Sequence, residues 1–266
     1  MRSNLFVGIS SAVAAVAVAG SANAGLATGK IDGFTGTTFT GYTGIGAGDS
    51  VEGPYANGTL GFNYRSVGTM GVSKGTTNTL VTTANVNAVT GGNQVQALVK
   101  SGSTRTTSAL PDMYAAWLWG NAAGFDSNGT ATSFNSFDMS NASSFTVSFA
   151  DNTFGTTGFS GTNLRIEIQL QSNVNSDIWS AQQAVTSSGG TLTFNAADFG
   201  AGAAASWTNL GAVWLYVYYD VPSGLSAGTN LGNVTLTDFS YNAVPAPGAA
   251  ALVGMAGLIT GRRRKA

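Results

Sequence analysis

The sequence predicts an all-β protein built as an antiparallel β-sandwich, and two observations carry this prediction. Several segments alternate apolar and polar residues with the period of a strand, and residues 164–171 alternate without exception. No amphipathic segment of helical length lies within residues 25–243, so the strand–helix–strand rhythm of a parallel sheet is missing. We therefore expect one β-sandwich domain over residues 25–242.

The expected strands follow one another with turn-rich spacers between them. Besides residues 164–171, the alternating segment 145–149 fits a strand, and three more segments are rich in β-branched and aromatic residues: 191–194, 212–219 and 233–241. Near the N-terminus, residues 33–48 are rich in Gly and Thr with spaced aromatics, which fits an edge strand or an ordered loop.

The first residues are typical of a secretory signal peptide. Arg2 supplies a positive charge, the stretch from Leu5 to Ala19 is apolar, and Ala22 and Ala24 fit the small-x-small cleavage pattern. We expect a signal helix over residues 1–24, removed by signal peptidase, so that the mature chain begins near Gly25.

The last residues have three parts in a fixed order. Val244, Pro245, Ala246 and Pro247 precede an apolar stretch over residues 248–261, which ends at a basic cluster made of Arg262, Arg263, Arg264 and Lys265. As a short apolar helix these 14 residues would measure about 21 Å, less than the roughly 30 Å of a bilayer core. With the basic cluster on the cytoplasmic side, the segment fits a transient inner-membrane anchor better than a permanent span.

This order resembles the PEP-CTERM sorting signal of Gram-negative bacteria, in which a proline motif, an apolar helix and an arginine cluster are recognised by an exosortase. Ala246 stands where the commonest motif has Glu, as in the Val-Pro-Ala-Pro variant. The resemblance implies that residues 243–266 form a sorting tail, that an exosortase-like protease removes it, and that the protein reaches the cell surface or extracellular matrix. An ordinary C-terminal tail anchor is the alternative.

Composition and charge exclude several functions. The chain has 266 residues, of which only 9% are charged, and it contains neither Cys nor His, so disulfides, thiol nucleophiles and His-dependent catalysis are ruled out. The two ends carry five of the eleven basic residues, which leaves six basic against twelve acidic residues in 25–243, a net charge of −6. Such a body disfavours nucleic acid and anionic lipid as partners.

The order of segments in residues 112–242 resembles the galactose-binding-domain-like jelly roll of many bacterial carbohydrate-binding modules. The matching segments are 137–140, 145–149, 164–171, Trp179, 192–194, 198–199, 207–210 and 234–239. The resemblance implies a jelly roll with a structural Ca²⁺ between its first and last strands, for which Asp32 and Asp238 are the matching ligands. Hard oxygen donors are all this sequence can offer a metal, although Asp also favours turns for backbone reasons. No other cofactor is expected.

Trp214, Tyr216 and Tyr218 are the strongest candidate for a binding surface. In a strand their side chains point to one face while the aliphatic residues between them point to the other. On an open face, such a row could stack against the sugar rings of an exopolysaccharide. A central strand buried on both faces is the commoner arrangement and gives the same continuous apolar run.

The remaining tryptophans are weaker candidates for a binding surface. Trp179 and Trp207 stand in turn-like contexts and could flank such a row, although each fits a core position as well. Trp117 and Trp119 share a face in another expected strand, and we expect both in the core.

Carboxylates give little support to an enzyme. A glycoside hydrolase needs two of them about 5–10 Å apart, and the only glutamates are Glu52, in a turn-like segment, and Glu167. Glu167 lies two residues from Arg165 on the same face, so a solvated ion pair explains it more simply. We therefore expect no catalytic activity.

Together these features predict a secreted, exosortase-sorted β-sandwich with a structural or adhesive role. A non-catalytic carbohydrate-binding module is the alternative function, and a glycoside hydrolase is the third.

Overall fold

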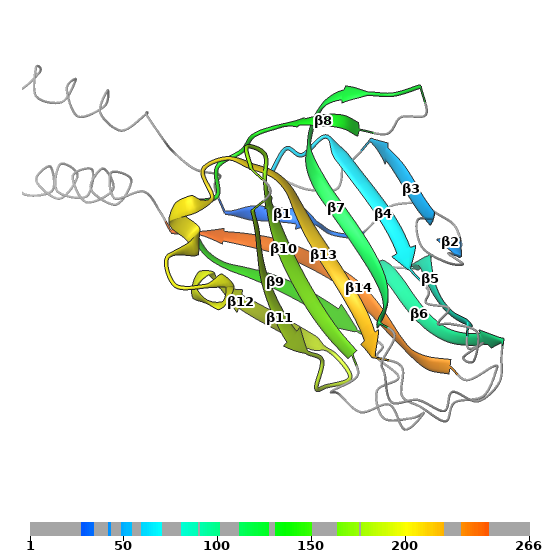
Figure 1. The fold of residues 1–266 in the computed structure, drawn as a ribbon. Helices are drawn as coiled ribbons and strands as arrows, with labels where there is room; N and C mark the ends of the chain where they lie inside the picture. The colour runs from blue at the N-terminus through cyan, green and yellow to red at the C-terminus, as the bar shows by residue number, and fades with distance from the viewer. Residues whose placement is uncertain are drawn as a thin grey trace, which may run out of the picture.

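The protein is a sandwich of two antiparallel sheets in the computed structural model (Figure 1). The structure describes residues 28–34, 42–43, 49–54, 60–70, 81–89, 91–101, 112–127, 131–150, 164–175, 177–220 and 230–244. The predicted fold class, an all-β antiparallel sandwich, is confirmed. The expected signal helix and apolar tail helix, with Ala22, Ala24 and the tail residues from Pro245 onward, lie outside the described residues.

The first sheet, which we call the β14 sheet, has the order β12-β9-β14-β6-β5-β2, and β1 pairs with β14 as well. Its strands are β1 (Gly29–Asp32), β2 (Tyr42–Thr43), β5 (Val81–Val89), β6 (Gly92–Ser101), β9 (Ala142–Ala150), β12 (Gly190–Asn195) and β14 (Asn230–Ala243).

The second sheet, the β13 sheet, has the order β11-β10-β13-β7-β4-β3, and β8 pairs with β7. Its strands are β3 (Asp49–Pro54), β4 (Tyr64–Met70), β7 (Asp112–Phe125), β8 (Ala131–Asn135), β10 (Leu164–Ser172), β11 (Ile178–Ala184) and β13 (Leu210–Asp220). Two short 3₁₀ helices, η1 (Ala196–Phe199) and η2 (Ala203–Ser206), connect β12 to β13. No helix among the described residues is long and apolar enough to cross a membrane.

The core lies between the two sheets and follows the alternation that the sequence shows. On β10, the four aliphatic side chains of the alternating segment are buried, while the polar ones between them are partly exposed. Large aromatic side chains fill the space between the sheets, among them Trp117, Trp119, Trp207, Phe145 and Phe239, all 0% exposed. The expected core positions of Trp117 and Trp119 are confirmed.

A charged cluster is buried between the sheets. Arg65 of β4 and Asp32 of β1 come from opposite sheets, and Nε of Arg65 lies 3.0 Å from Oδ2 of Asp32. The same carboxylate accepts hydrogen bonds from Nε1 of Trp119 at 3.1 Å and from the backbone N–H of Phe34 at 2.6 Å. With its amide oriented to suit its neighbours, Asn93 of β6 accepts a hydrogen bond from Nη2 of Arg65 at 3.0 Å. The cluster therefore compensates both buried charges while joining the two sheets.

The first and last described strands lie side by side. β1 pairs with the C-terminal half of β14, with Gly29 opposite Tyr241. Just outside the pairing, the Thr28 hydroxyl accepts a hydrogen bond from the backbone N–H of Ala243 at 2.8 Å. The backbone N–H of Val244 donates to the Asn141 carbonyl at 2.8 Å. Both ends of the described chain therefore leave the sandwich at one pole.

Candidate binding face

The outer face of the β13 sheet carries the aromatic residues singled out in the sequence. On β13, Val213, Leu215, Val217 and Tyr219 point inward and are 0% exposed, while Trp214, Tyr216 and Tyr218 are partly exposed on the opposite side. The alternation of the two faces follows directly from strand geometry. Only the inner face of this strand is fully buried. The alternative that the apolar run also allowed, a central strand buried on both faces, is therefore wrong for β13.

The three rings form an ordered row. The Trp214 and Tyr216 rings stack with centroids 5.8 Å apart at 16°, and the Tyr216 and Tyr218 rings stack with centroids 5.4 Å apart at 12°. Tyr114 of β7 packs edge-on against both tyrosines, with 5.5 Å between centroids in each case. We call these four residues the aromatic row. Because each ring holds its neighbour, the row is set before any ligand binds, which lowers the entropy cost of binding.

Tyr114 is not identified from the sequence as part of the binding surface, although one feature of the sequence indicates the face to which it points. It lies an odd number of residues before Trp117 and Trp119, so in a strand it must point to the face opposite these core residues. Its place beside Tyr216 and Tyr218 depends on the register of β7 against β13, in which Tyr114 pairs with Tyr218. That register depends on contacts between segments far apart in the chain, and no local sequence pattern predicts it.

Polar side chains of β10 lie alongside the aromatic row. The register sets Gln169 opposite Trp214, Glu167 opposite Tyr216 and Arg165 opposite Tyr218. Together with Gln171 these residues form what we call the polar row, and all four are partly exposed. Neighbouring strands lie only about 4.8 Å apart, so the two rows present aromatic and polar groups next to each other.

Direct contacts join the two rows. The indole Nε1 of Trp214 donates a hydrogen bond to Oε1 of Gln171 at 3.2 Å. The Arg165 guanidinium carbon lies 5.7 Å from the centre of the Tyr218 ring, within the range of a cation–π contact. The Trp214 and Tyr218 rings are therefore held both by the neighbouring rings of the aromatic row and by side chains of the polar row.

A chain of hydrogen bonds runs through the polar row. Nη1 of Arg165 donates to Oε1 of Gln182 on β11 at 2.9 Å. Nε2 of Gln182 reaches Oε2 of Glu167 at 3.5 Å, and Nε2 of Gln169 donates to Oε1 of Glu167 at 2.8 Å. Two opposite charges are thus connected through amides on one face.

Two phenols of this face, those of Tyr216 and Tyr114, are uncharged donors. Burial raises the pKa of Tyr216 well above its usual value of 10.0, and Tyr114 and Glu167 raise it further. Burial also raises the pKa of Tyr114. Both hydroxyls therefore stay protonated at neutral pH and can donate as well as accept hydrogen bonds.

The hairpin of β7 and β8 limits the row at the Trp214 end. The ring of Tyr64, which is 2% exposed, contacts those of Phe125 and Phe134 at centroid distances of 6.0 and 5.6 Å. Together with Leu118 and two alanines, Tyr64 forms a small buried cluster on this outer face, and Trp214 packs against it. The hairpin thus covers one end of the face and leaves Tyr216 and Tyr218 beyond it.

Two other tryptophans proposed as neighbours of the row lie elsewhere. Trp179 of β11 pairs with the inward-facing Leu170 and packs partly buried against the main core. It therefore lies on the opposite face from Trp214 and is not part of the aromatic row. Trp207 is 0% exposed and is a core residue.

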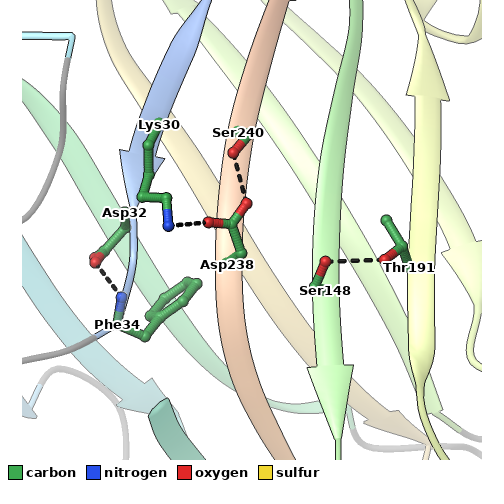
Figure 2. A network of polar contacts seen from close by, with 7 residues as sticks. All are labelled: Lys30, Asp32, Phe34, Ser148, Thr191, Asp238 and Ser240. Carbon is green, nitrogen blue, oxygen red and sulfur yellow. Dashed lines mark hydrogen bonds and ion pairs between the residues drawn. The ribbon is translucent and has the colours of Figure 1, made fainter. Parts of the chain in front are cut away.

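The two predicted calcium ligands are each bound to a basic side chain of the protein. Asp32 belongs to the buried cluster with Arg65. Asp238 lies partly exposed on β14, where Oδ1 is 2.6 Å from Nζ of Lys30 and Oδ2 accepts a hydrogen bond from Ser240 (Figure 2). Among the described residues no three acidic side chains gather where they could hold a metal ion. Each of the two carboxylates is thus paired with a cation of the protein, and the Ca²⁺ site expected at Asp32 and Asp238 stays a prediction.

Comparison with known proteins gives a distant similarity in structure. No protein-family model matches the chain, and no curated protein matches it either. Among solved structures, a xylan-binding module, CBM15, is similar over 74% of this chain and 97% of that chain, with 12% sequence identity and a TM-score of 0.33.

Proposed function

We propose that this chain is an exported, non-catalytic protein that binds polysaccharide through the outer face of the β13 sheet. One observation carries the proposal: Trp214, Tyr216 and Tyr218 are partly exposed and stand in register with the polar row of β10. The two rows together supply both kinds of group that a sugar requires.

The chemistry of a sugar ring explains why both rows are needed. A pyranose has a face of C–H groups, which pack on aromatic rings, and a rim of hydroxyls, which donate and accept hydrogen bonds. The aromatic row offers large apolar area at low conformational cost. The amide, carboxylate and guanidinium groups of the polar row offer fixed donors and acceptors to the rim.

The same proposal includes the destination of the protein. The signal sequence and the three-part tail support export and sorting, with signal peptidase and an exosortase-like protease as processing partners. A polysaccharide-binding sandwich released at the surface of a Gram-negative cell would have the adhesive role expected from the sequence, and exopolysaccharide of the matrix would be its ligand.

Removal of the aromatic row tests the proposed binding face. We expect Trp214→Ala and Tyr216→Ala each to weaken binding to a retained polysaccharide about tenfold or more, because central aromatic contacts contribute about 1.4 kcal/mol or more. Retention in native gels containing the polysaccharide measures this.

Val174→Ala is the control, because Val174 is an apolar residue 75% exposed in the turn after β10, outside both rows. Its binding should stay close to that of the wild type. Equal retention of all three variants and the wild type would reject this face as the binding site, and no retention on any polysaccharide would reject the function.

A further inference from the structure

The charges of the described side chains on the binding face balance each other. Among the described side chains of β7, β10, β11 and β13 that point outward, Arg165 and Glu167 are the only charged ones. They lie two residues apart on one strand and both bind Gln182. The described face therefore has one positive and one negative charge, and otherwise aromatic rings, amides, hydroxyls and aliphatic groups.

The basic group of this face is already engaged. The Arg165 guanidinium lies over the Tyr218 ring and donates to the Gln182 amide. To bind a carboxylate or sulfate of a ligand, it would have to give up these contacts while Glu167, on the same strand, repels the incoming anion. The net charge of −6 over residues 25–243 adds a repulsion that acts over roughly 10 Å in dilute salt.

The row is also long enough to contact more than one sugar. Its three β13 rings follow one another at 5.8 and 5.4 Å, and a polar partner stands opposite each ring. A monosaccharide would cover only part of this surface, whereas a chain of sugars can contact all of it.

From these observations, and resting on the proposed function, we infer that the ligand is a neutral polysaccharide chain, and that the paired charges of Arg165 and Glu167 exclude polyanionic glycans. The selectivity is electrostatic: the aromatic row supplies the attraction common to all sugars, and the balanced charges decide between neutral and acidic chains.

Two mirrored variants of the full-length chain test the inference. Among the described side chains of the face, Glu167→Gln leaves one positive charge and Arg165→Gln leaves one negative charge, while both variants retain an amide that can form hydrogen bonds. Retention is measured in native gels containing hydroxyethyl cellulose or galactomannan as neutral probes, and alginate or hyaluronate as acidic probes, at low and at physiological salt.

We expect the wild type to be retained strongly by a neutral probe and only weakly by the acidic ones at low salt. The ratio of acidic to neutral binding should rise about fivefold in Glu167→Gln and fall in Arg165→Gln, because the first variant removes a negative charge close to the bound anion and the second removes a positive one. High salt should reduce the difference between the two variants.

The possible failures are distinguishable. Strong retention of the wild type by alginate or hyaluronate, lost in Trp214→Ala, would overturn the inference and leave polysaccharide binding intact. An unchanged acidic-to-neutral ratio in both charge variants would overturn it as well. Absence of retention on all four probes would overturn the proposed function, and this inference with it.

Discussion

Asp32 shows how a single residue can have a role that its sequence context does not disclose. Next to Gly33 and near the first expected strand, it fits a calcium ligand or a turn residue. In the structure it is buried and paired with Arg65, which lies in the other sheet. Two residues this far apart in sequence, in segments of different sheets, share no local pattern, so the ion pair could not be predicted before the fold was known.

The Asp32–Arg65 pair is expected to be critical for stability. Asp32→Asn leaves the Arg65 charge buried without its counter-ion, which should cost about 3–5 kcal/mol in the free energy of unfolding. Urea unfolding followed by tryptophan fluorescence measures this. Asp32→Leu combined with Arg65→Met should recover much of the loss, because it removes both charges together.

The pair of Lys30 and Asp238 provides the control. Their side chains are 44% and 26% exposed, so Asp238→Asn should cost no more than about 1 kcal/mol. If Asp32→Asn and Asp238→Asn had equal effects, the buried pair would not have the stabilising role assigned to it.

At the scale of elements, the alternation of apolar and polar residues predicts the strands and their two faces, but it does not predict the register between strands. The alternating pattern of residues 164–171 identified β10 and both its faces, and the apolar run of residues 212–219 identified β13. The pattern could not say that Glu167 lies opposite Tyr216, or that β7 brings Tyr114 to the same face. Those pairings decide the candidate site, and they depend on contacts between segments that are far apart in the chain.

The hairpin of β5 and β6 offers a test of close strand packing. Val89 pairs with Gly92 around a tight turn, and a side chain at Gly92 would overlap the backbone carbonyl of Leu236 in β14. Gly92→Asn should therefore lower the free energy of unfolding by about 1–3 kcal/mol, as overpacking does. Thermal unfolding followed by circular dichroism measures the change.

Gly91 is the matched position for the same substitution. Its φ of +80° suits Asn, and open space surrounds it. Gly91→Asn should leave the melting temperature close to that of the wild type. A larger loss for Gly91→Asn than for Gly92→Asn would contradict this account of the β6–β14 contact.

At the scale of the whole molecule, the sequence was sufficient for the class of fold but not for the division of strands between sheets. Residues 145–149 and 164–171 have the same alternating pattern, yet β9 belongs to one sheet and β10 to the other. Binary patterning specifies which side of a strand is buried, and the connections and total packing decide which sheet it joins. The candidate binding face exists only because β7, β10 and β13 become neighbours.

Sorting is a property of the whole chain and has its own prediction. Deletion of Arg262–Lys265 should leave the precursor in the membrane fraction, because the apolar stretch 248–261 remains while the expected recognition site of the protease that would release it is lost. Cell fractionation with an antibody against the sandwich measures the ratio of membrane-bound to released protein, and Lys265→Ala alone should be released as the wild type. Normal release of the deletion variant would refute the sorting proposal.

The pairing of β1 with β14 also determines how the protein would bear mechanical load. For a molecule held at residue 244 and bound to polysaccharide on β13, tension enters the sandwich along β14. The half of β14 where it enters is hydrogen-bonded to β1 on one side and to β9 on the other. A pull along the strand loads these bonds together in shear, so they must break at once instead of opening one after another. The sandwich is therefore anchored at a strand whose hydrogen bonds on both sides resist the pull together.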